Sequence, residues 1–124
     1  NDLHGRLITY TSDAISGFLQ DMERLGRADD VTLMIFSEFG RRVPENTSIG
    51  TDHGAANNMF VVGGQVKGGH YGDRPSLTKL DAGDNLVFTT DFRRVYSTMV
   101  EGWLKQKTTP DLLNGNFKPF DMFA

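Results

Sequence analysis

The sequence predicts an α/β domain in which helices cover both faces of a mostly parallel sheet. Two apolar runs, VTLMIFS at residues 31–37 and MFVV at residues 59–62, contain almost no polar side chains. Such nearly continuous runs are typical of parallel strands that are buried on both faces. An amphipathic segment precedes the first run and a long polar loop separates the two runs. This order of helix, strand, loop and strand favours an α/β domain.

The helices are predicted from apolar side chains that recur at steps of three and four residues. The first helix is expected over residues 3–25, with Gly26 where a C-terminal cap belongs. A second helix is expected over residues 91–104, and Pro110 begins a short third one. The aromatic tail FKPFDMFA is expected to pack back onto the body of the domain.

Composition excludes several classes of protein. The net charge of −3 and the pI near 5.5 argue against a general nucleic-acid-binding protein, which would show a basic stripe. The chain has no cysteine, which excludes a disulfide framework, a thiolate zinc site and a cysteine nucleophile. The apolar runs are too short for a transmembrane segment.

Two buried strands are too few for a stable parallel sheet. The chain also begins at Asn1 rather than at methionine. We therefore expect residues 1–124 to form a single partial domain, the C-terminal portion of a larger one. Alternatively, two copies complete each other as a homo-oligomer through exposed sheet edges.

Four polar side chains are candidates for chemistry. Glu38 follows the first strand, where ligands of open α/β sheets bind, and Asp52 and His53 lie on the loop before the second strand. Carboxylate and imidazole groups suit a divalent metal such as zinc or manganese, so these residues are the predicted metal ligands. Arg41 is the predicted substrate-binding residue, because a guanidinium group binds phosphate or sulfate oxygens in pairs.

Each candidate also has a structural interpretation, and the sequence leaves the choice open. Glu38 could form an ion pair with an arginine, and Asp52 could bond its own backbone in a turn. Arg41 could face solvent without a ligand. His53 could be an ordinary polar residue of a turn.

Three long motifs carry a resemblance to a known family: FSEFGRRVPEN, GTDHGAANNMFVVGGQVKGGHYG and TTDFRRVYSTMVEGWL. They closely resemble a bacterial family known as domain of unknown function 1501, which itself resembles a branch of the alkaline phosphatase and sulfatase superfamily. The resemblance implies a three-layer, mostly parallel, alkaline phosphatase-like fold. It also implies a metal-dependent hydrolase of small phosphate or sulfate esters in the full-length form, exported to the periplasm or the outside of the cell.

The resemblance also implies roles for individual residues. Glu38 is similar to a metal-binding aspartate of the superfamily, and His53 is similar to a later metal histidine with Asp52 as an additional carboxylate. Phe39 stands where the superfamily has a metal-binding histidine, and a phenyl ring cannot ligate. The catalytic nucleophile is expected upstream of Asn1, so the fragment alone is expected to be inactive. The departure at Phe39 supports an alternative, an exported module that keeps the fold without the chemistry.

Overall fold

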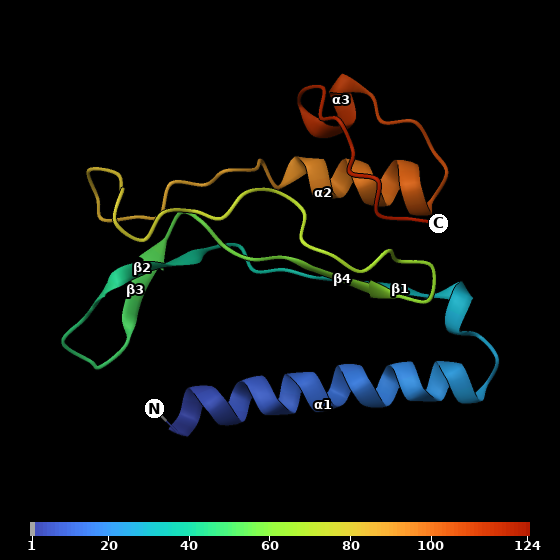
Figure 1. Cartoon of the computed structure of the whole chain (residues 1–124), viewed down its shortest axis with the longest axis horizontal. Coiled ribbons are helices and arrows are strands. Elements are labelled where there is room, and N and C mark those ends of the chain that lie inside the picture. Colours follow the sequence, from blue (N-terminus) through green and yellow to red (C-terminus); the bar gives the residue numbers. More distant parts are fainter. Residues whose placement is uncertain (1) are drawn as a thin grey trace.

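The computed structural model describes residues 2–124, with Asp2 described by its backbone only, and Figure 1 shows their arrangement. A long helix is followed by two small sheets and then by a C-terminal helical region. In chain order the elements are α1 (Asp2–Arg24), the short 3-10 helix η1 (Ala28–Asp30), β1 (Thr32–Ile35), β2 (Gly40–Glu45), β3 (Thr51–Gly54), β4 (Phe60–Gly63), α2 (Arg93–Thr98), the π-helical turn η2 (Met99–Trp103) and α3 (Pro110–Leu113).

The predicted sheet is wrong. Strand β1 pairs antiparallel with β4, so that Thr32 lies opposite Gly63 and Ile35 lies opposite Phe60. Strand β2 pairs antiparallel with β3, and residues 2–124 form only these two two-stranded sheets. The expected three-layer, mostly parallel sheet of the alkaline phosphatase type is therefore contradicted. The apolar runs do not encode strand direction, and the expected burial on both faces is also wrong, because β1 is half-buried and Phe60 of β4 is exposed.

Helix α1 lies close to its predicted bounds. It ends in a Schellman motif, in which Gly26 takes φ 67° and the Arg27 N–H donates to the Met22 carbonyl at 2.8 Å. Its apolar stripe is only partly covered, because Ile15 and Leu19 are half-buried while Leu7 is 53% exposed. Figure 1 shows α1 and α2 on opposite sides of the β1–β4 pair. No helix in residues 2–124 is long and apolar enough to cross a membrane.

The core gathers around α2 rather than around the strands. Thr98 and its neighbour Ser97 are completely buried, and Phe123 of the tail is 7% exposed. Helix α2 begins where Asp91 accepts hydrogen bonds from the Arg93 backbone N–H at 2.9 Å and from its guanidinium at 2.9 and 2.7 Å. These guanidinium hydrogen bonds hold the pKa of the Asp91 carboxyl below its ordinary value. The burial of Phe123 shows that the aromatic tail packs onto the body, as its sequence predicts.

Candidate functional site

The β2–β3 hairpin carries three of the four candidate residues, in a segment that the sequence predicts to be loop after residue 42. In its register, Gly40 lies opposite Gly54 and Arg41 lies opposite His53. Both glycines are needed for close backbone approach: a Cβ on Gly40 would lie 1.4 Å from the Ala56 carbonyl oxygen, and one on Gly54 would lie 2.6 Å from the Arg41 carbonyl carbon. The two glycines therefore set how closely the hairpin packs.

The turn of the hairpin is built by one asparagine. The Asn46 side-chain oxygen accepts hydrogen bonds from the backbone N–H groups of Ser48 at 3.0 Å and Gly50 at 3.1 Å. This Asx-type arrangement lets the chain reverse without a two-residue glycine turn. The Asn46 side-chain amide also donates to the Asp52 carboxylate at 3.0 Å. Asp52 is thereby tied to the turn.

One surface of the hairpin brings together an aromatic ring, a guanidinium and an imidazole, and we call it the hairpin face (Phe39, Arg41 and His53). Cross-strand partners and residues two apart project to the same side of a sheet, which places these three side chains together. The Phe39 and His53 rings stack with centroids 3.6 Å apart and an interplanar angle of 14°. The central guanidinium carbon of Arg41 lies 5.3 Å from the Phe39 ring centre. The His53 imidazole is thus stacked on the Phe39 ring, with the Arg41 guanidinium beside the same ring.

The backbone further orients the guanidinium. Arg41 Nη1 donates to the Thr51 carbonyl oxygen at 2.8 Å, across the two strands. A guanidinium has five N–H donors, so this bond leaves others directed to solvent from an exposed side chain. The arrangement can bind a planar or tetrahedral oxyanion beside His53.

Asp52 and His53 are adjacent in the sequence, but their side chains contact different residues. Both belong to β3, and successive side chains of a strand point to opposite faces. The Asp52 carboxylate contacts Asn46, while the His53 ring contacts Phe39. A role for Asp52 in orienting His53 therefore stays a prediction, without a contact between the two side chains to support it.

Glu38 lies in the exposed bend between β1 and β2. Because β1 and β4 are antiparallel, the end of β1 lies beside the start of β4, and the Asn57 side-chain amide donates to the Ser37 carbonyl at 3.2 Å. The segment that carries Glu38 and the segment that follows His53 hence meet at one end of the β1–β4 pair. Antiparallel pairing, rather than the carboxyl ends of parallel strands, brings these segments together, and a shared site for the Glu38 and His53 side chains stays a prediction.

A metal ion needs several ligand side chains close together. Within residues 2–124, no three histidine, aspartate or glutamate side chains lie close enough together to hold one. A structural zinc site needs four ligands and a catalytic one needs three from protein. His53 fits as a single imidazole ligand, and the others would have to come from outside these residues. The assignment of Glu38, Asp52 and His53 as metal ligands stays a prediction.

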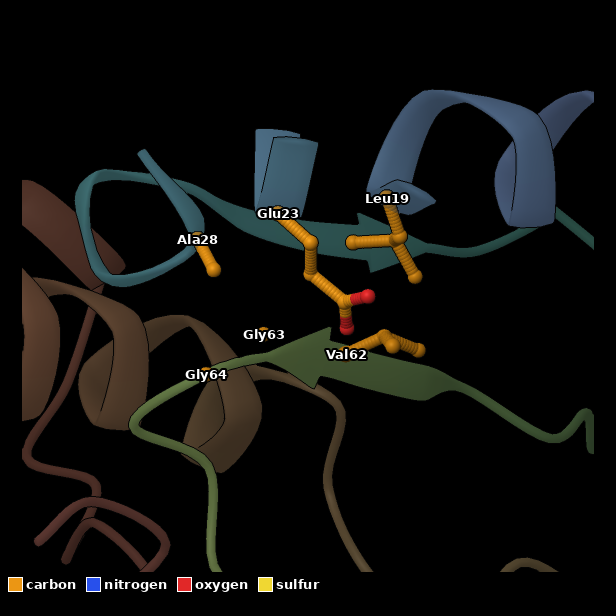
Figure 2. A pocket seen from close by; sticks show the side chains of 6 residues that line it. All are labelled: Leu19, Glu23, Ala28, Val62, Gly63 and Gly64. Atoms are coloured by element: carbon orange, nitrogen blue, oxygen red, sulfur yellow. The ribbon is translucent and has the colours of Figure 1, made fainter. Parts of the chain in front are cut away.

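Two hollows in the described part of the chain lie away from the hairpin face. Figure 2 shows the first, a cavity of about 190 Å³ between α1 and β4 into which the Glu23 carboxylate points. The second, of about 310 Å³, is almost entirely apolar and lies between β1 and the C-terminal helices. Its lining residues are Met34, Tyr96, Met99, Val100, Leu112 and Leu113. The hairpin face is therefore a surface site, with none of its three side chains in either hollow.

Comparison with known proteins bears on the family. A family model described as "Protein of unknown function (DUF1501)" matches residues 1–100. The chain belongs to the DUF1501 family. No curated protein and no solved structure gave a match. In this DUF1501 chain the matched residues include the whole hairpin, while the match ends within η2 and leaves out all that follows residue 100.

Sequence reasoning missed part of the site. Phe39 was noted only as a residue that cannot ligate, whereas its ring is the stacking partner of His53. No sequence pattern marks Thr51, whose carbonyl orients Arg41. The spacing of Phe39 and Arg41 by two residues, followed by the turn sequence NTSIG, is the signal that could have indicated a hairpin with both side chains on one face.

Proposed function

We propose that the full-length DUF1501 protein is a metal-dependent hydrolase of phosphate or sulfate esters, and that the hairpin face binds the anionic group of the ester. The observation that carries the proposal is the register of β2 and β3, which sets Arg41 directly opposite His53 on one face. The reaction class rests on the resemblance to alkaline phosphatases and sulfatases. That resemblance also supports a site of action outside the cytoplasm.

In this proposal each residue of the hairpin face has one role. The Arg41 guanidinium, fixed by the Thr51 carbonyl, holds two oxygens of the anion. The Phe39 ring excludes water from one side of the imidazole and keeps His53 beside that anion. His53 would hold a divalent metal together with ligands supplied by other parts of the protein. Such a metal, when bound, would polarise the ester and stabilise the charge that develops on its oxygens.

A second function is favoured by a specific observation. By the resemblance to the superfamily, Phe39 stands in the place of a metal-binding histidine, and a phenyl ring cannot ligate. This departure suits a module that keeps the anion-binding face and has lost hydrolysis. In that case the hairpin face would bind sulfated or phosphorylated polymers without cleaving them.

The test uses the full-length protein with three variants, His53→Ala, Arg41→Lys and His70→Ala. His70 is an exposed loop histidine and serves as the matched control. Metal content is measured by elemental analysis, and hydrolysis is measured with p-nitrophenyl phosphate and p-nitrophenyl sulfate. We expect Arg41→Lys to lower kcat/KM by roughly 10- to 100-fold, because the paired hydrogen bonds to the anion are lost while the charge remains.

The outcomes separate the two functions. Loss of bound metal and of hydrolysis in His53→Ala, with both retained in His70→Ala, supports the hydrolase. Metal content and hydrolysis that are unchanged in His53→Ala reject it. A wild-type protein that binds sulfated polymers but neither holds metal nor cleaves either ester supports the non-catalytic module.

A further inference from the structure

We propose that α2–η2 and residues 65–71 form a groove for an extended, phenylalanine-rich peptide, and that residues 117–124 (FKPFDMFA) are its resident ligand. We call this segment the C-terminal strap. It crosses α2 in Figure 1 and ends beside the loop that follows β4. The residues of this groove do not include those of the hairpin face, and the inference does not depend on the proposed hydrolysis.

The helix forms one wall of the groove and binds the strap through its backbone. The Phe120 N–H donates to the Thr98 hydroxyl at 2.8 Å, and Arg94 Nε donates to the Lys118 carbonyl at 2.9 Å. Thr98 is completely buried and also donates to the Arg94 carbonyl at 2.7 Å. The helix thus directs a buried hydroxyl and a guanidinium at main-chain groups, which any peptide sequence possesses.

The loop after β4 forms the other wall. The Lys67 N–H donates to the Met122 carbonyl at 2.7 Å, and the Ala124 N–H donates to the Gln65 carbonyl at 3.1 Å. These bonds flank an isolated antiparallel bridge at Phe123. Addition of a short extended segment to an exposed main-chain edge is a recurring mode of peptide recognition. The strap is held between the two walls by hydrogen bonds to its main chain.

Side chains add sequence preference, because the phenylalanines of the strap are spaced by three residues. Each ring has a partner in the groove, with centroid or guanidinium-carbon distances of 4.1 Å for Phe117 and Arg93, 4.0 Å for Phe120 and Arg94, and 6.0 Å for Phe123 and Trp103. Gly102 makes room for the last ring, because a Cβ there would lie 2.4 Å from Phe123.

Release of the strap would break no helix and only the single bridge at Phe123, and it would uncover Met122 and Phe123, which are each 7% exposed in the bound strap. Its ion pair, Lys67 with Asp121 at 2.7 Å, is exposed and therefore contributes little to holding it. The family match ends at residue 100, so it includes α2 and the loop wall but neither the strap nor Gly102 and Trp103 of the groove. A peptide with phenylalanine at every third position is the partner that the vacated groove would fit.

Hydrogen exchange on the intact chain tests whether the strap opens as a unit. We expect the amides of Lys67, Phe120 and Ala124 to exchange together and at least about tenfold faster than the amides of β1 and β4. Exchange of these three amides only with global unfolding would show that the strap is a permanent part of the core, and would overturn the proposal.

Competition with a free peptide tests whether the groove binds in trans. The probe is a fluorescent peptide with the sequence of residues 116–124, and the control peptide has its three phenylalanines replaced by alanine. The tethered strap competes at an effective concentration on the order of millimolar. A weakened strap, Phe120→Ala in the intact chain, leaves the groove unchanged and is expected to bind the probe at least about tenfold more tightly than the wild type.

A milder variant guards against misfolding of Phe120→Ala. Asp121→Ala removes the exposed ion pair with Lys67, so it is expected to shift probe binding in the same direction by no more than about a few fold. Quenching of Trp103, the only tryptophan, reports on occupancy of the Phe123 position. Probe affinities that are equal in the wild type and both variants, or equal for the probe and the control peptide, would overturn the proposal.

Discussion

Replacement of Gly40 by alanine is expected to destabilise the chain by about 3 kcal/mol or more, which corresponds to a fall in Tm on the order of 10 °C. The new methyl group would lie 1.4 Å from the Ala56 carbonyl oxygen and 2.3 Å from its carbon. These atoms belong to the backbone, so the overlap cannot be relieved by rotating a side chain. The hairpin would have to separate from residues 55–57, and with it the register of Arg41 and His53 would change. Thermal unfolding followed by circular dichroism measures the effect.

The matched control is Gly68→Ala. Gly68 is exposed, its φ does not lie in the left-handed region, and a Cβ there would meet no atom within 4 Å. We expect its Tm to stay close to that of the wild type. Equal Tm values for the Gly40 and Gly68 variants would contradict the packing of the hairpin described above.

Replacement of Thr98 by valine is expected to cost about 1–3 kcal/mol, concentrated in the C-terminal strap. Valine has nearly the shape of threonine but lacks the hydroxyl that accepts the Phe120 N–H and donates to the Arg94 carbonyl. The Phe120 N–H would be left in a buried place without an acceptor. Urea unfolding gives the change in the free energy of unfolding, and hydrogen exchange at Phe120 shows where stability is lost.

Thr98→Ser separates the hydroxyl from the volume of the side chain. Serine keeps the hydrogen bonds and loses one methyl group, which costs on the order of 1 kcal/mol in a core. We expect Phe120 to stay protected from exchange in Thr98→Ser and to lose protection in Thr98→Val. Equal loss of protection in both variants would indicate that packing, rather than the hydroxyl, holds the strap.

The helices and the positions of the two apolar strands could be predicted from the sequence because their signals are local. The three- and four-residue repeat in residues 3–25 needs no knowledge of the rest of the chain, and Gly26 marks where α1 ends. The strand runs at residues 31–37 and 59–62 likewise lie close to β1 and β4. Their direction could not be predicted, since pairing depends on contacts between segments far apart in the sequence.

The hairpin could not be predicted because its local signals oppose a strand. Residues 40–45 contain Pro44 and two charged arginines, and β3 is only the tetrapeptide TDHG. What holds the two strands together is the Asn46 turn and the close approach at Gly40 and Gly54. These features are recognisable only once the two segments are known to be neighbours.

The sequence predicts several residues of the candidate site but not how they are arranged. Arg41 and His53 were both named from the sequence, and the register brings them opposite each other. Asp52 was grouped with His53 because they are neighbours in the chain, but strand alternation directs the carboxylate towards Asn46. Phe39, noted as a missing ligand, packs against the imidazole instead. Alternation within a strand can be used only after the strand is known.

A titration of the full-length protein with inorganic phosphate, followed by NMR at the His53 imidazole and the Arg41 guanidinium, tests the anion site most directly. An anion site on the hairpin face predicts saturable shifts of both groups with one dissociation constant, and no shift at His70. Arg41→Lys should weaken that constant by roughly tenfold or more, since the two-pronged contact is lost. Phosphate that binds the protein while the His53 and Arg41 signals stay unchanged would contradict an anion site on the hairpin face.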